Sequence, residues 1–217
     1  MGNGLGYALA MSALSALLLA IALHVTWNMQ ARQVPRDREF LWWALAGHLL
    51  LLGPWSLAML FAQADWQGTL VACVLVSGAA LTLYFLGLRI AYQHAPVALA
   101  YPLARSSPLF IALASALLFG ESFNTSGLLG IGVSTLALVM LGRTAWRGDA
   151  RAALAPALLA ALGTTAYSLS DKVAVAYLPT PGSQLGYVSL AYLFAWLGLG
   201  ARLRGETGRW VPVRRPG

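Results

Sequence analysis

Seven long apolar stretches, separated by short polar segments, constrain this chain more than any other feature of its sequence. They cover residues 7–28, 40–62, 69–92, 97–119, 126–142, 153–175 and 185–203. A helix needs about 20 mostly apolar residues to cross the hydrocarbon core of a bilayer, and each stretch is near that length. With 59% hydrophobic residues, 10% charged residues and a mean hydropathy of +0.70, the chain has little material for a water-soluble domain. The sequence therefore predicts an all-α membrane protein with about seven transmembrane helices.

The basic residues fall on alternate polar segments. The segments 63–68, 121–125 and 177–184 contain no arginine. The segment between the first two stretches, the segment between the fifth and sixth, and the tail hold Arg32, Arg36, Arg38, Arg143, Arg147, Arg151, Arg202, Arg204, Arg209, Arg214 and Arg215. Because cytoplasmic loops carry an excess of basic residues, this pattern predicts an external N-terminus and a cytoplasmic C-terminal tail. The net charge of +7 would suggest nucleic-acid binding only if the arginines shared one soluble face, so we expect no nucleic-acid partner.

Several other classes of protein and site are disfavoured. A single cysteine, Cys73, allows neither an intrachain disulfide nor a thiolate metal site. The first seven residues lack the basic segment of a signal peptide, so the first stretch is expected to remain as a span. The sequence offers no nucleophile with a neighbouring base and no cluster of metal ligands. We therefore expect no enzyme activity, no metal ion and no cofactor.

The fourth apolar stretch carries a charged residue, Arg105. It lies nine residues beyond Pro96, so it is about 13 Å from the membrane edge at 1.5 Å per residue. Pro102 and Pro108 each remove a helical hydrogen bond, and Ser106 supplies a hydroxyl between them. A broken helix with a buried cation is a common way to build a transporter binding site. We expect Arg105, Ser106 and the nearby Tyr101 to bind substrate; a purely structural arginine is the alternative.

The first stretch offers a titratable ring, an indole and an amide on one helix face. His24, Trp27 and Asn28 are spaced by three and four residues, so their side chains are neighbours on a helix. One interpretation is a substrate-binding face with His24 as a proton-coupling residue. The other assigns Trp27 and Asn28 to the interfacial belt near Arg32.

The sixth stretch carries Tyr167, Asp171 and Lys172. Asp171 and Lys172 are sequence neighbours and point about 100° apart on a helix, so each needs another partner. Lys172 can extend to the interface. We expect Asp171 to be a proton-coupling carboxylate that faces Arg105, and Tyr167, like Tyr84 of the third stretch, to be an aromatic wall.

Small residues recur every fourth position in two consecutive stretches. Ala112, Ala116 and Gly120 form one series, and Ser126, Gly130 and Ser134 form the other. Small residues allow membrane helices to approach closely, so the two faces are predicted to pack against each other.

A weak internal repeat aligns the chain with itself at an offset of about 140 residues. Trp27 then matches Tyr167, Asn28 matches Ser168, and Arg32 matches Lys172. Five predicted spans separate the copies, so the second copy would enter the membrane in the opposite sense, as in inverted-repeat transporters.

The motifs of residues 83–142 resemble those of the EamA-like branch of the drug/metabolite transporter superfamily. They are Ala95-Pro96-Val97, Tyr101-Pro102-Leu103-Ala104-Arg105, Ser107-Pro108-Leu109, Phe119-Gly120-Glu121 and the Gly-Ile-Gly sequence at 130–132. Residues 24–28 with Arg32, and residues 167–172, are similar to the family's first-span and sixth-span patterns. The resemblance implies two inverted five-helix halves in a bacterial inner membrane, around a central cavity that exports amino acids, metabolites or drugs.

The sequence has room for seven of the ten spans that the resemblance implies. Residues 1–145 would form the first five-helix repeat, 146–203 two helices of the second, and 204–217 a disordered cytoplasmic tail. We expect a secondary transporter of small polar or anionic solutes, truncated relative to the family, in contact with the lipid bilayer. The alternatives are a non-transporting fragment, a subunit completed by a partner chain or a second copy, and a seven-helix receptor. A retinal-type receptor is disfavoured because the stretch 185–203 has no lysine.

Overall fold

The computed structural model describes residues 39–146 and 149–212, and the single residues Ser15, Leu18, Leu19, Ala22 and Thr26. The chain divides into two compact units, Met1–Phe40 and Leu41–Gly217. His24, Trp27, Asn28 and Arg32 lie outside the described residues. In the part that the structure describes, all regular secondary structure is helical, which confirms the predicted all-α class.

The second predicted span is broken into two helices, α2 (Phe40–Leu51) and α3 (Gly53–Gln63). The two helix axes differ by 62°. Pro54 lies in the first turn of α3, where its missing N–H costs no helical hydrogen bond. The break thus falls at a position where a new helix can begin without the loss of a hydrogen bond.

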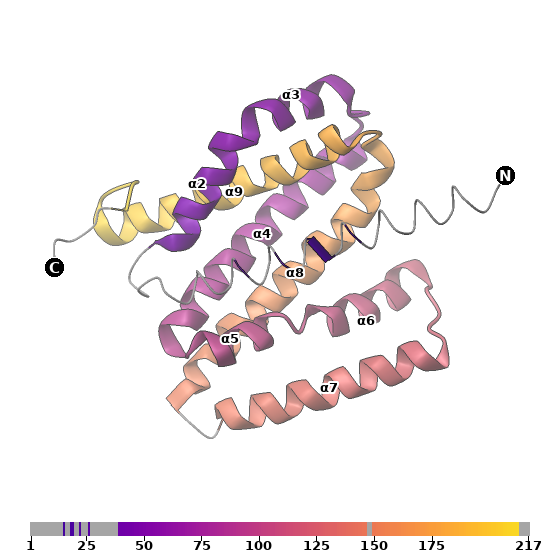
Figure 1. The fold of residues 1–217 in the computed structure, drawn as a ribbon, viewed down its shortest axis with the longest axis vertical. Coiled ribbons are helices and arrows are strands. Elements are labelled where there is room, and N and C mark those ends of the chain that lie inside the picture. The colour runs from indigo at the N-terminus through magenta and orange to yellow at the C-terminus, as the bar shows by residue number, and fades with distance from the viewer. Residues whose placement is uncertain are drawn as a thin grey trace. The chain divides into compact units, whose positions relative to one another are not determined.

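Three long helices form the centre of the second unit: α4 (Gly68–His94), α8 (Leu154–Ala174) and α9 (Pro181–Thr207). Helix α4 packs against both α8 and α9, and α9 also packs against α3 (Figure 1). The short 3₁₀ helices η1 (Asp149–Ala153) and η2 (Val175–Tyr177) flank α8. Thr180 and Ser183 form a capping box that starts α9.

The fourth predicted span is also broken, into α5 (Val97–Ala104) and α6 (Ser107–Phe119). Both pack against α8, and α7 (Thr125–Trp146) packs against α5 and α6 (Figure 1). Arg105 and Ser106 form the break, between Pro102 and Pro108. The kink predicted from these two prolines is therefore present.

The helices agree with the predicted spans from the second to the seventh. Four segments are long and apolar enough to cross a membrane: Gly68–His94, Pro102–Phe119, Ala150–Tyr177 and Pro181–Thr207. The bent pair of α2 and α3 makes a fifth if it is one span, and α7 contains a shorter apolar stretch, Thr125–Met140. Large apolar side chains such as Leu129, Val133 and Leu136 are exposed along α7, as expected for a surface that meets lipid. The chain is thus a multi-pass membrane protein.

The predicted packing of the two small-residue faces is wrong at both glycines, Gly120 and Gly130. A Cβ atom on Gly120 or Gly130 would meet no other atom within 4 Å. Gly120 instead ends α6 in the left-handed conformation, with φ +66°. The close helix contacts involve other glycines: a Cβ on Gly87 of α4 would lie 2.6 Å from the Pro156 carbonyl oxygen of α8, and Gly186 of α9 lies against Ser56 of α3.

Polar segments that alternate along the chain meet at opposite ends of the second unit. At one end, the Asp65 N–H donates to the Tyr177 carbonyl, and Thr180 hydrogen-bonds to Gln63. At the other end, Arg89 of α4 pairs with Glu206 of α9. Helix α9 continues to Thr207, so residues 204–207, expected in the tail, form its last turn. The arrangement supports the alternation on which the predicted topology depends.

Candidate functional site

Arg105 lies at the break between α5 and α6, where regular helical hydrogen bonding is interrupted. The Ser106 N–H donates to the Leu103 carbonyl at 3.2 Å, a tighter turn than in an α-helix. Arg105 is exposed, and its guanidinium carbon lies 5.9 Å from the centre of the Tyr84 ring. At this distance the ring face attracts the cation. Tyr84 of α4 therefore helps to orient the Arg105 side chain.

Aromatic side chains extend from this contact across α4, α8 and α9. The Tyr84 ring is edge-on to Tyr167 of α8, with centroids 6.2 Å apart, and to Phe85, at 4.9 Å. Phe85 in turn meets Tyr192 of α9 at 6.2 Å. Tyr192 also interacts electrostatically with Arg105. We call Arg105, Tyr84, Phe85, Tyr167 and Tyr192 the Arg105 cluster.

The Arg105 cluster lies near the middle of its helices. Tyr84 is 16 residues from the start of α4 and 10 from its end, or about 24 Å and about 15 Å along the axis. Tyr167 is 10 residues before Tyr177, or about 15 Å from that end. Such a depth is typical of substrate sites in transporters, which lie near the bilayer midplane.

A chain of polar side chains leads from the Arg105 cluster to the bend between α2 and α3. The His48 ring of α2 meets the Tyr192 ring edge-on, with centroids 4.7 Å apart. His48 Nε2 is 3.0 Å from Ser189 Oγ, which is 2.8 Å from Ser56 Oγ of α3. Ser56 and Ser189 are fully buried. Each hydroxyl thus has the partner that a buried polar group requires.

Asp171 belongs to a second polar group, one helical turn beyond Tyr167. Ser77 Oγ of α4 donates to Asp171 Oδ1 at 2.7 Å, and the Tyr187 hydroxyl of α9 is 2.7 Å from Ser77 Oγ. Among the described residues, Asp171 forms no ion pair. Asp171 thus forms no ion pair with Arg105 in the described part of the chain. The α8 residue that contacts Tyr84 of the Arg105 cluster is Tyr167, four residues before Asp171, or about 6 Å along the helix.

Lys172 forms an ion pair with Glu121, in the segment that follows α6. The Lys172 ammonium nitrogen also lies 4.6 Å from the centre of the Phe119 ring. The hydrogen bond from Lys172 holds the pKa of Glu121 below its usual value. Glu121 is therefore a negatively charged tether between the end of α6 and α8.

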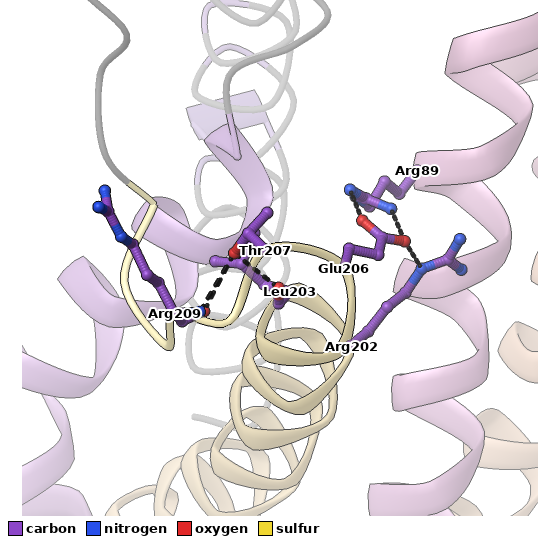
Figure 2. Close-up of polar contacts among 6 residues, drawn as sticks. All are labelled: Arg89, Arg202, Leu203, Glu206, Thr207 and Arg209. Atoms are coloured by element: carbon purple, nitrogen blue, oxygen red, sulfur yellow. Dashed lines mark hydrogen bonds and ion pairs between the residues drawn. The ribbon is translucent and has the colours of Figure 1, made fainter.

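A network of two arginines and one glutamate joins α4 to the last turn of α9 (Figure 2). Arg89 Nη2 is 2.9 Å from Glu206 Oε2, and Arg202 Nε is 2.7 Å from Glu206 Oε1. The Arg89 side chain is the most buried of the three, at 15% exposed. We call this group the terminal ion-pair network.

The structure brings together only part of the predicted substrate site. Arg105, Tyr84 and Tyr167 are adjacent, and Ser106 is the residue before α6, where its side chain forms no capping bond. The Tyr101 side chain lies outside the part that the structure describes, as do His24, Trp27 and Asn28. Asp171 lies in a separate polar group.

Sequence reasoning did not select Phe85, Tyr192, His48, Ser77 or Tyr187. One signal was available, because Ser77 and Tyr84 are seven residues apart and share a face of an otherwise apolar helix. The same spacing joins Thr164 to Asp171 on α8. Tyr192 and His48 carry no such signal, since only the tertiary fold places them side by side.

The described residues include no group of three or more His, Cys, Asp or Glu side chains that could hold a metal ion. The arrangement instead combines apolar spanning helices, two helix breaks and a cation at mid-depth, which suits binding of a solute inside a membrane. No curated protein and no solved structure matches the chain. Residues 8–143, more than half of the 217, match the model of the EamA-like transporter family, and the chain therefore belongs to that family of membrane transporters.

Proposed function

We propose that this protein is a secondary transporter that exports small organic solutes with a carboxylate group, such as amino acids or organic acids, across a bacterial cytoplasmic membrane. The observation that carries the proposal is the position of Arg105, at a helix break at mid-depth and over the Tyr84 ring. A guanidinium presents a planar fork of donors that matches a carboxylate. A charge at this depth costs free energy, and charged residues inside the membrane are therefore typically functional.

The surroundings of Arg105 suit the rest of such a solute. Tyr84 and Tyr167 offer ring surfaces for an apolar side chain, and their hydroxyls can hydrogen-bond to polar groups. The break between α5 and α6 releases backbone groups that a helix would use internally. We also propose Tyr101 and Ser106 as substrate-binding residues and, on the sequence alone, Trp27 and Asn28. His24 remains a candidate for proton coupling, and the protein is proposed to act together with a partner chain or a second copy.

The proposal is tested by transport in proteoliposomes with radiolabelled alanine, glutamate and lactate as probes and a lipophilic cation as comparator. Arg105→Ala should lower transport of the carboxylates by roughly tenfold or more, because a charge-assisted pair is lost. Arg105→Lys should retain only part of the carboxylate transport, because the lysine ammonium keeps the charge but lacks the planar pair of donors of the guanidinium. Arg209→Ala removes an equal charge beyond the end of α9 and serves as the matched control.

A melting measurement on the same variants separates recognition from folding. If Arg105 binds solute, Arg105→Ala should melt within a few degrees of the parent. A large fall in melting temperature, or unchanged carboxylate transport, would remove Arg105 from the substrate site. Oligomeric state measured in the same detergent shows whether a second copy is present during transport.

A further inference from the structure

Asp171 is linked to α4 by a direct hydrogen bond and to α9 through Ser77. Ser77 Oγ of α4 donates to Asp171 Oδ1 at 2.7 Å. The Tyr187 hydroxyl of α9 lies 2.7 Å from Ser77 Oγ and 3.2 Å from the Cys73 carbonyl oxygen of α4. Ser77 and Tyr187 are 1% and 3% exposed, so water does not replace these contacts. We call Asp171, Ser77, Tyr187 and the Cys73 carbonyl the relay.

The directions of the two side-chain hydrogen bonds in the relay, Asp171 to Ser77 and Ser77 to Tyr187, depend on the charge of Asp171. When Asp171 is ionised it only accepts, so Ser77 must donate to it and Tyr187 donates to Ser77. When Asp171 is protonated it can donate to Ser77 Oγ; Ser77 then donates to the Tyr187 oxygen, and Tyr187 turns to the Cys73 carbonyl. No O–H bond other than that of Asp171 forms or breaks, because the two hydroxyls only rotate.

We propose that Asp171 is the site at which this transporter takes up and releases its coupling proton, and that Ser77 and Tyr187 transmit its protonation state from α8 to α4 and α9. The inference rests on the proposed transport function. One proton from water adds to the Asp171 carboxylate and later returns to water, so no other reactant is needed. Uptake of the proton removes a charge from inside the membrane and reverses the two hydrogen bonds that join the three helices.

The geometry fits a proton better than a metal cation. A hard cation gathers six or more oxygen atoms around an open centre. Ser77 Oγ instead lies at hydrogen-bond distance from both Asp171 Oδ1 and the Tyr187 hydroxyl. The Cys73 carbonyl, with two lone pairs, already accepts from Ser170 Oγ at 3.1 Å. The relay therefore has no space between its oxygens for an ion.

In the described part of the chain, the charged and titratable groups around Asp171 include no cation that pairs with its carboxylate. A proton is therefore the positive charge that neutralises Asp171. On α8 itself, Lys172 pairs with Glu121 from the end of α6. From α9, Tyr187 and Tyr192 face Asp171, and α4 contributes the buried Cys73 thiol. Arg105, at the break between α5 and α6, interacts electrostatically with Tyr192, but no cation in the described part of the chain pairs with Asp171.

The relay is also within reach of one membrane surface. Asp171 is six residues from Tyr177, and Tyr187 is six residues from Pro181, or about 9 Å in each case. The Arg105 cluster lies about one helical turn deeper along α8. A proton can thus enter from the end that carries Asp65 and Tyr177, while α4, α8 and α9 connect the relay to Tyr84, Tyr167 and Tyr192.

Infrared difference spectroscopy of the full chain in lipid, titrated with pH, tests the relay without any solute. The parent should show a carboxylic-acid C=O band that appears on acidification and is absent from Asp171→Asn. Ser77→Ala removes a donor to the charged carboxylate, so the titration midpoint should rise by about one pH unit. Thr165→Ala is the matched control, since the buried Thr165 hydroxyl of α8 donates to the Ala161 carbonyl and not to a member of the relay.

The role of Tyr187 has its own signature. The tyrosine C–O band that is lost in Tyr187→Phe should change with the same midpoint as Asp171, and it should not respond to pH in Asp171→Asn. A missing Asp171 band, a midpoint unaffected by Ser77→Ala, or a Tyr187 band that ignores pH would each overturn the relay.

Transport then separates this inference from the proposed function. Asp171→Asn should keep exchange of solute between the two sides of the membrane but lose the dependence of net transport on a pH gradient. Retained dependence on the pH gradient in Asp171→Asn would overturn the coupling role even if Arg105 proves to bind the solute. Loss of transport in Arg105→Ala with an intact Asp171 band would support both.

Discussion

Gly163 of α8 lies against the backbone of α4 beside Tyr84: a Cβ atom on Gly163 would be 2.9 Å from the Tyr84 amide nitrogen and 2.7 Å from the Ala80 carbonyl oxygen. Helix backbones this close leave no room for any side chain. The contact fixes the distance between the two helices that carry Tyr84 and Tyr167. The geometry of the Arg105 cluster therefore depends on Gly163, although Gly163 is not a member of the cluster.

The first prediction concerns this helix crossing. Gly163→Ala should lower the stability of the protein in detergent by about 1–3 kcal/mol, because the added methyl group meets backbone atoms that cannot turn aside. Gly130→Ala, at a position with nothing within 4 Å, should be neutral or slightly stabilising. Melting temperatures of the two variants provide the measurement, and an equal effect on both would contradict the close contact.

The second prediction concerns topology. In a Cys73→Ala background, cysteines introduced at Asp65 and at Gly205 should react with a membrane-impermeant thiol reagent from opposite sides of the membrane. Asp65 lies at the end that carries Tyr177, and Gly205 lies in the last turn of α9. The arginine pattern predicts that Gly205 is cytoplasmic. Labelling of both positions from one side would contradict the arrangement of α4, α8 and α9.

The third prediction concerns the terminal ion-pair network. Glu206→Gln should lower the free energy of unfolding by no more than about 1 kcal/mol, since the Glu206 side chain is 40% exposed and solvent screens the pairs. The loss should shrink at high salt. A double-mutant cycle of Glu206→Gln with Arg202→Gln, followed by thermal melting, isolates this pair, and zero coupling would contradict a contribution from the Arg202–Glu206 contact.

The fourth prediction concerns pH. The pKa of Glu121 is lowered in the folded state by the hydrogen bond from Lys172. A lowered folded-state pKa contributes stability above the ordinary Glu pKa, and that stability is lost as the pH falls through the folded-state value. The melting temperature of the parent should thus fall more than that of Glu121→Gln between about pH 7 and about pH 3. Parallel curves for the two proteins would contradict the effect of the ion pair.

Much of the fold could be predicted from the sequence because it depends on local chemistry. Runs of apolar residues determine which segments can lie in a bilayer, since backbone groups there must pair within a helix. Pro102 and Pro108 predicted the break that separates α5 from α6. The exposed apolar faces of α7 likewise follow from composition. The family of the protein also follows from residues 8–143 alone.

The partners of the polar side chains were decided only by the tertiary structure. The sequence identified Arg105 and Asp171 as unusual, but it could not show that Ser77 donates to Asp171 or that Tyr84 lies beneath Arg105. These pairs are far apart in the chain, and small rotations of α4, α8 and α9 decide which faces meet. Small residues are common in membrane helices, so their spacing suggested Gly120 and Gly130, whereas the helices meet at Gly87 and Gly163. Periodicity indicates which residues share a face of a helix; packing of all the helices decides which faces touch.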